Sequence, residues 1–310
     1  MSAKNTPPTS SVAPGGTEQQ DPRYGDIDLW PVISVLDSLA EAQMTATAVA
    51  RAAVPQMNDV VTAALPRLRA GGRLFYVGAG TSGRVGLQDG VELTPTFGWP
   101  SERLILMLAG GTTALFEAVE GAEDREETAS REILSHNPGP NDVVFGIAAS
   151  GATPYTCAAI AAARNAGALT VGISCNGEGR LLREAELGIA IVTGAEVITG
   201  STRLKAGTAQ KAVLNMLSTT LMIKLGHGYC GQMVDMRVVN AKLEKRAARM
   251  VQDLAGGTPE EIEAALQASS QNVKRAILIR SGLTLEDAET ALTQYAGDLR
   301  AVMAAQADRG

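Results

Sequence analysis

The residues best suited to chemistry in this chain form a short glycine and hydroxyl loop, Gly78-Ala79-Gly80-Thr81-Ser82-Gly83. The apolar run Leu74–Val77 precedes the loop, and a stretch of helical character follows it. Backbone N–H groups at a helix start are unpaired and the helix dipole favours negative charge there. Together with the hydroxyl groups of Thr81 and Ser82, this arrangement predicts an anion site after a buried strand.

The glycine spacing at positions 78, 80 and 83 also matches the G-x-G-x-x-G pattern of dinucleotide-binding folds. Such folds carry an acidic residue about 20 residues on, at the end of the second strand, which holds the ribose. Here the next apolar run, residues 104–108, ends in Ala109-Gly110-Gly111 without an acid. The loop therefore indicates a phosphate monoester rather than a dinucleotide. A plain strand-to-helix turn without a ligand is the alternative interpretation.

Two later segments place polar groups after strand candidates in the same way. The run at 143–148 is followed by Ser150, Gly151 and Thr153, with Pro154 suited to the first position of a helix. Residues 194–211 are dense in polar groups and lead into a helix expected at about 205–225. Two hydroxyl-rich loops at one sheet edge can meet around a single phosphate. Read alone, Ser150 fits a helix N-cap and the 194–211 segment fits a solvated loop.

The elements that must position these loops alternate between strand and helix from about residue 70 to residue 225. Strand candidates lie at 73–77, 104–108, 143–148, 169–173 and 189–192. Uniformly apolar strands separated by helices predict an α/β fold with a parallel sheet covered on both faces. Ligands in such sheets bind at the carboxyl ends of the strands. Residues 30–69 also have helical spacing, with Pro55 predicted to open a second helix.

The bulk composition excludes several classes of function. The 310 residues carry a formal net charge of −6 without a basic cluster, which argues against a nucleic-acid partner. Three cysteines without a C-x-x-C pair indicate neither a disulfide framework nor a zinc site, and fit a reducing cytoplasm. The sequence shows neither an apolar run near the ~18 residues of a membrane span nor an apolar signal core, so we expect no membrane association.

We expect the chain to divide into three regions. Residues 1–22 are rich in Ser, Thr, Pro, Gly and Gln, and we expect a disordered tail. Residues 23–255 would form the main domain with its N-terminal helices. Residues 256–310 would form a small helical domain, which begins with the capping box Thr258-Pro259-Glu260-Glu261.

Five segments together resemble the N-acetylmuramic acid 6-phosphate etherases, a family with the SIS phosphosugar-binding fold and related to the glucokinase regulatory proteins. They are residues 78–84, 89–92, 119–124, 150–155 and 194–211. The resemblance runs from about Thr17 to the C-terminus. It implies a three-layer α/β sandwich with a central parallel sheet, and a UBA-like helical domain at the C-terminal end. It also implies a cytoplasmic homodimer without cofactor or metal.

The activity implied by the resemblance is cleavage of the lactyl ether of a 6-phosphosugar substrate during peptidoglycan recycling. A base removes the C2 proton and an acid protonates the departing lactate oxygen. The resemblance places these roles on Glu92, as the acid, and Glu123, as the base, although the pair is better supported than the assignment within it. From the residues alone, Glu92 fits a helix-surface position as well, and Glu123 fits a solvated acidic run.

The resemblance also implies a set of residues that bind the substrate and its phosphate. They are Gly80, Thr81, Ser82, Ser150, Gly151, Thr153, Glu196, Ser201, Thr202, Arg203 and Lys205. Arg203 and Lys205 lie near a helix start, where cations do not complement the dipole, and a bound anion would compensate them.

Five positions depart from the family pattern, namely Asp21, Tyr24, Val91, Thr94 and Ala152. Ala152 stands where the family commonly has an arginine, and Val91 where it has a hydroxyl. These departures leave open whether the substrate differs from that of the family. The alternatives are a sugar-phosphate sensor without turnover, and an aldose–ketose isomerase of the same fold that releases nothing.

Overall fold

The computed structural model describes residues 16–307 and contains a single five-stranded sheet within this range. The strands are β1 Leu74–Gly78, β2 Leu104–Leu108, β3 Val143–Ala148, β4 Leu169–Ser174 and β5 Leu187–Ala190. All neighbouring pairs are parallel, in the order β2-β1-β3-β4-β5. The predicted parallel sheet is confirmed. The last strand begins two residues before the predicted 189–192, because Leu187 pairs with Val171 of β4.

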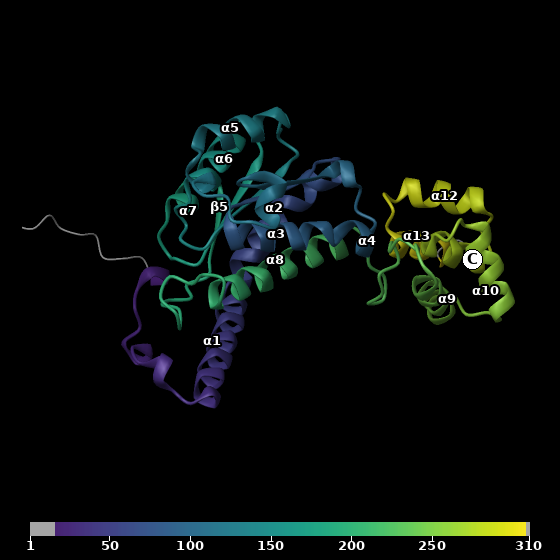
Figure 1. Cartoon of the computed structure of the whole chain (residues 1–310). Coiled ribbons are helices and arrows are strands. Elements are labelled where there is room, and N and C mark those ends of the chain that lie inside the picture. The colour runs from purple at the N-terminus through teal and green to yellow at the C-terminus, as the bar shows by residue number, and fades with distance from the viewer. Residues whose placement is uncertain (1–15, 308–310) are drawn as a thin grey trace, which may run out of the picture.

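Helices cover both faces of the sheet (Figure 1). They are α1 Val32–Ala52, α2 Val54–Arg69, α3 Gly80–Val91, α4 Leu93–Phe97, α5 Glu126–Ser135, α6 Pro154–Asn165, α7 Arg180–Glu184 and α8 Lys205–Lys224. Strand side chains such as Tyr76 and Phe145 pack with α1, α2 and α8, whereas Phe75 and Val144 pack with α5 and α6. This alternation follows from the period of two along a strand. The three-layer α/β class is thus confirmed.

The C-terminal helices have a hydrophobic core of their own and form a separate lobe in Figure 1. They are α9 Ala241–Ala255, α10 Pro259–Ala268, α11 Val273–Arg280, α12 Leu285–Gln294 and α13 Leu299–Ala307. The predicted capping box at the start of α10 is formed by both of its hydrogen bonds, between Thr258 and Glu261. Helix α9 contributes Ala247, Met250 and Val251 to this core.

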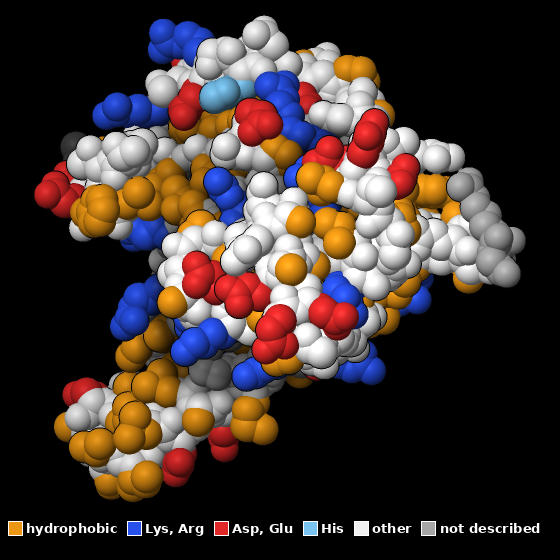
Figure 2. Space-filling model, turned by 90° about the vertical axis from the view of Figure 1, so that its right-hand side faces the viewer, with side chains coloured by type: hydrophobic (Ala, Val, Ile, Leu, Met, Phe, Trp, Pro, Cys, Tyr) orange, Lys and Arg blue, Asp and Glu red, His pale blue; other side chains and the backbone are white. Residues whose placement is uncertain are grey.

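Helix α1 begins far from the sheet and runs back toward it (Figure 1). Its first turns and the residue before them expose large apolar side chains, with Leu29 78% and Val32 76% exposed. Ile33 and Leu36 continue this surface. Figure 2 shows hydrophobic side chains gathered at the lower end of the molecule, where Figure 1 places the start of α1. None of the helices within residues 16–307 is long and apolar enough to cross a bilayer.

Candidate active site

The sheet order places a topological switch point between β1 and β3. The chain passes from β1 outward to β2 and then returns to β3 on the other side, so the loops after β1 and β3 diverge and leave a crevice. A cavity of about 380 Å³ lies in this crevice. Its lining includes Glu18, Gly80, Thr81, Ser82, Glu123, Asp124, Ser150, Ala152, Thr153 and Thr202. The two hydroxyl-bearing loops predicted to meet therefore do meet.

The first loop owes its shape to two glycines that touch. A Cβ on Gly83 would stand 2.4 Å from Leu108 Cδ1 and 2.7 Å from the carbonyl carbon of Gly78. Only glycine permits this approach, which seats the first turn of α3 directly on the end of β1. The Gly83 N–H donates to the Ala79 carbonyl, and the N–H groups before it in that turn have no acceptor within the helix. Thr81 and Ser82 thus lie beside unpaired backbone donors at the cavity wall.

The second loop turns sharply at Gly151, whose φ is +67°. A Cβ at that position would lie 2.4 Å from Ser174 Oγ, so the close approach also requires glycine. Thr153 is the N-cap of α6, and Pro154 occupies its first turn as predicted. The Ser150 hydroxyl oxygen accepts the Ala152 N–H at 3.2 Å. Ser150 is therefore not the N-cap of α6, and it lines the cavity instead.

The N-terminal segment supplies a contact that the sequence did not reveal. Thr17 is fully buried, and its N–H donates to Asn176 Oδ1 at 3.2 Å. Asn176 Nδ2 donates in turn to Thr17 Oγ1 at 3.3 Å and to the Ser150 carbonyl at 3.0 Å. This places Glu18 in the cavity lining. The disordered tail predicted for residues 1–22 falls largely on residues 1–15, which lie outside the described residues.

The segment after β5 contributes less to the cavity than predicted. The fully buried Glu196 carboxylate accepts the Lys205 N–H at 3.1 Å and the Ala206 N–H at 2.8 Å. Lys205 Nζ donates to the Ala195 carbonyl at 2.5 Å. Glu196 and Lys205 thus build the start of α8, and Glu196 supplies the negative charge expected there. From this segment Thr202 lines the cavity, whereas Ser201 and Arg203 are not part of the lining.

Of the two candidate catalytic glutamates, Glu123 lines the cavity and Glu92 of the same chain does not. Glu123 is exposed in the 3-10 turn Ala122–Asp124 and lines the cavity. Glu92 is exposed just after the last residue of α3 and is not part of the cavity lining. At a rise of about 1.5 Å per residue, the length of α3 separates Glu92 from Ser82 by roughly 15 Å.

The cavity lining is acidic. Glu18, Glu123 and Asp124 face it, and within the described residues no Lys or Arg lines it. Ala152, one of the five departures named above, lies in the cavity wall. The acidic departure Asp21 is paired locally: Arg23 Nη2 lies 2.7 Å from its carboxylate, and hydrogen bonding to Arg23 lowers the pKa of Asp21. An anion bound at this wall would therefore depend on backbone and hydroxyl donors.

Cys157 and Cys175 are poorly suited to act as nucleophiles. Burial raises the pKa of Cys175, which follows β4, to about 12, and that of Cys157 in α6 to about 11. Both thiols stay protonated near neutral pH, and a thiol rather than a thiolate is a poor nucleophile. The acid–base chemistry of carboxyl groups is what this cavity can support.

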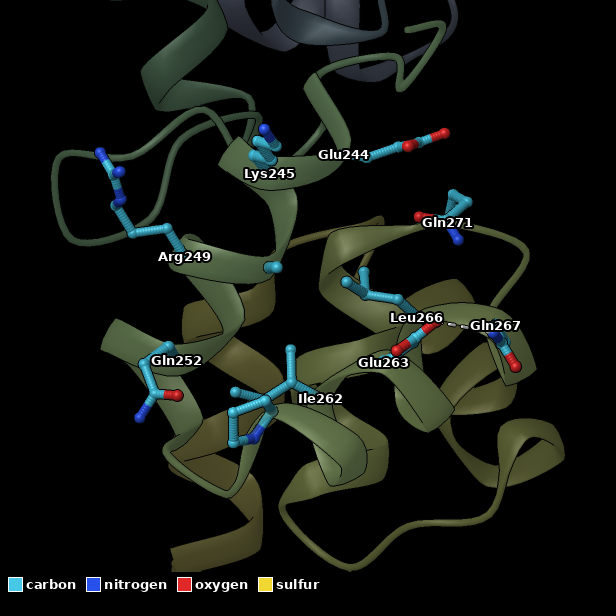
Figure 3. Close-up of a pocket in the computed structure, with 11 residues that line it drawn as sticks. Glu244, Lys245, Arg249, Gln252, Ile262, Glu263, Leu266, Gln267 and Gln271 are labelled. Carbon is cyan, nitrogen blue, oxygen red and sulfur yellow. Dashed lines mark hydrogen bonds between the residues drawn. The ribbon is translucent and has the colours of Figure 1, made fainter. Parts of the chain in front are cut away.

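A second cavity of about 520 Å³ lies between α9 and α10 (Figure 3). Lys245, Arg249 and Gln252 form one wall, and Ile262 and Leu266 line the other. It holds none of the predicted site residues and no loop at a strand end. We therefore place the candidate active site at the switch point.

Comparison with known proteins places the chain in a family. The model of the SIS domain matches residues 125–220, and that of the glucokinase regulatory protein N-terminal SIS domain matches residues 56–165. The N-acetylmuramic acid 6-phosphate etherase of Deinococcus radiodurans is 46% identical over 291 residues, covering 94% of this chain and 95% of that protein. The chain belongs to the N-acetylmuramic acid 6-phosphate etherase family. The resemblance predicted from five segments is confirmed.

Another etherase of this family, from Erwinia tasmaniensis, is 45% identical and covers 93% of this chain and 94% of that protein. Among solved structures, a phosphoheptose isomerase from Francisella tularensis aligns with a TM-score of 0.47 and 16% identity. The alignment covers 63% of this chain and 98% of that one.

Asn176→Ala tests the contact that joins the N-terminal segment to the second loop. The substitution leaves the buried Thr17 N–H and the Ser150 carbonyl without their partner, at about 1–3 kcal/mol for each group. We expect faster amide hydrogen exchange in residues 16–18 and 150–153 and a lower free energy of unfolding. Asn165→Ala, at the exposed end of α6, is the control. Unchanged exchange in both segments would contradict this role.

Proposed function

We propose that this chain cleaves the D-lactyl ether of N-acetylmuramic acid 6-phosphate to N-acetylglucosamine 6-phosphate and D-lactate. The supporting observation is that Glu123 shares one switch-point cavity with the hydroxyl groups of both strand-end loops. The identity to etherases over nearly the whole chain supports the same reaction. In the cell, this activity would serve peptidoglycan recycling in the cytoplasm.

The phosphate would bind where the two loops face each other. Thr81 and Ser82 would donate from the first turn of α3, and Ser150 and Thr153 from the second loop. The unpaired N–H groups at the starts of α3 and α6 would complete the set, because helix N-termini favour anions. With the phosphate held there, the sugar would extend toward Glu123 and the N-terminal segment.

The reaction needs four proton transfers, two in the elimination and two in the addition of water, and would use no cofactor. In the open-chain sugar, the C1 aldehyde acidifies the C2 proton, which Glu123 would remove. The C3–O bond then breaks, and Glu92 would protonate the departing lactate oxygen, leaving a C2–C3 double bond. Water adds at C3 with Glu92 as the base, and Glu123 returns a proton to C2. Each carboxyl group ends in its starting state.

This scheme requires Glu92 to reach a cavity that it does not line in its own chain. We propose that the protein is a homodimer in which Glu92 of the partner subunit completes each site. The exposed apolar start of α1, with Leu29, Val32, Ile33 and Leu36, supports an assembly, because isolated proteins rarely expose such contiguous surface. The exposed position of Glu92 at the end of α3 fits a role across an interface.

Glu123→Gln tests the assigned base. The amide keeps the shape of the side chain but cannot accept the C2 proton, so we expect lactate release to fall by roughly 10²–10⁴-fold. Release from N-acetylmuramic acid 6-phosphate would be measured with D-lactate dehydrogenase. Glu127→Gln, in the same acidic run but outside the cavity lining, is the matched control. Equal release by Glu123→Gln and wild type would contradict the role, and an isomerised sugar without lactate would reveal the rival isomerase.

Mixed dimers test whether the two glutamates come from different subunits. A dimer of one Glu92→Gln chain and one Glu123→Gln chain, purified with two different tags, would contain one intact site and recover about half the wild-type activity. A dimer of wild type with the Glu92→Gln/Glu123→Gln double variant would be inactive, because each site would lack one group. The reverse pattern would show that both glutamates act within one chain.

A further inference from the structure

Ser82, a proposed phosphate ligand, is already engaged in the structure. Its hydroxyl donates to Gln210 Oε1 at 3.1 Å, across the contact between α3 and α8. Gln210 is fully buried, and Ser82 is only 8% exposed. A hydroxyl has one hydrogen to donate, so Ser82 cannot donate to Gln210 and to a phosphate at the same time.

Gln210 carries an unusual feature of its own. Its side-chain nitrogen, Nε2, is buried and has no hydrogen-bond partner within residues 16–307. Buried N–H groups without a partner are rare in native structures, because they have lost their contacts with water and gained nothing in return. The amide oxygen of Gln210 has a hydrogen-bond partner and its nitrogen has none. A rotation of the amide by half a turn would bring the nitrogen to Ser82 and give it a partner.

The backbone of α8 holds Gln210 in place. One turn earlier, Gly207 lies so close to α3 that a Cβ there would stand 3.3 Å from the Thr81 side chain and 3.3 Å from the Thr202 carbonyl. The start of α8 is pinned by the Glu196 carboxylate through the Lys205 and Ala206 N–H groups. Gln210 is thus presented to the back of the phosphate loop by a rigid helix.

We propose that Gln210 is a positioning residue for the substrate phosphate, a role that rests on the proposed phosphate subsite at Ser82. When phosphate binds, the Ser82 hydroxyl turns to donate to a phosphate oxygen. The Gln210 amide turns over, and Nε2 donates to Ser82 Oγ. The buried donor gains its partner, and the Ser82 hydrogen is directed at the ligand. Gln210 acts through Ser82 and does not touch the substrate.

Binding of N-acetylglucosamine 6-phosphate tests this role without requiring turnover. Gln210→Met retains a similar side-chain volume but can neither accept from nor donate to Ser82. We expect its dissociation constant, measured by titration calorimetry, to rise roughly tenfold. The KM should rise in parallel while kcat changes little. Inhibition by inorganic phosphate should weaken by the same factor.

A double-mutant cycle with Ser82→Ala separates this role from a general loss of structure. If Gln210 acts through Ser82, Gln210→Met should cause no further loss of affinity in the Ser82→Ala background. Equal losses in both backgrounds, or a Gln210→Met variant that binds as tightly as wild type, would overturn the proposal. Gln210→Glu, which retains the acceptor but cannot donate while ionised, replaces Gln210→Met if the latter does not fold, and should weaken binding further.

The same titrations test the role of Gln210 separately from the proposed etherase reaction. Wild-type protein that binds N-acetylglucosamine 6-phosphate but releases no lactate would reject the etherase reaction, and the cycle would still decide the role of Gln210. Wild-type protein that binds neither the phosphosugar nor inorganic phosphate would overturn both.

Discussion

The contact between Gly78 and Gly83 is the constraint on which the site depends. Without side chains at these two positions, α3 begins directly above the end of β1, and its unpaired N–H groups meet the crevice opened by the sheet order. The second loop turns into the same crevice because Gly151 can pack against Ser174. The cavity therefore depends on glycines at the ends of parallel strands. The residues next to these glycines in the two loops carry the hydroxyl groups that line it.

Two buried amides support this cavity from behind. Asn176 connects the Ser150 loop to Thr17, and Gln210 connects Ser82 to α8. Each joins segments far apart in the sequence, so long-range contacts hold the two hydroxyl-bearing loops in place. Glu196 has a comparable role, since its carboxylate fixes the start of the helix that carries Gln210. The acidic wall then leaves anion recognition to backbone and hydroxyl groups.

Much of this could be predicted from the sequence, because it depends on local patterns. Uniformly apolar runs located the strands, and Thr258 with Glu261 located the start of α10. The glycine and hydroxyl loops were found by spacing alone. The features that the sequence did not predict depend on long-range contacts. Glu18, for example, lines the cavity because Thr17 pairs with Asn176. The neighbours of Glu196 in the sequence likewise do not reveal that its carboxylate caps α8.

Elimination followed by water addition can be tested by isotope incorporation from the solvent. N-acetylmuramic acid 6-phosphate would be turned over in deuterium oxide enriched in ¹⁸O, and both products analysed by mass spectrometry. Elimination and water addition would place solvent deuterium at C2 of N-acetylglucosamine 6-phosphate and ¹⁸O at its C3 hydroxyl, with no ¹⁸O at the lactate hydroxyl. An ¹⁸O-labelled lactate hydroxyl, or a sugar without ¹⁸O at C3, would mean that the ether breaks by another route and would contradict the roles of both glutamates.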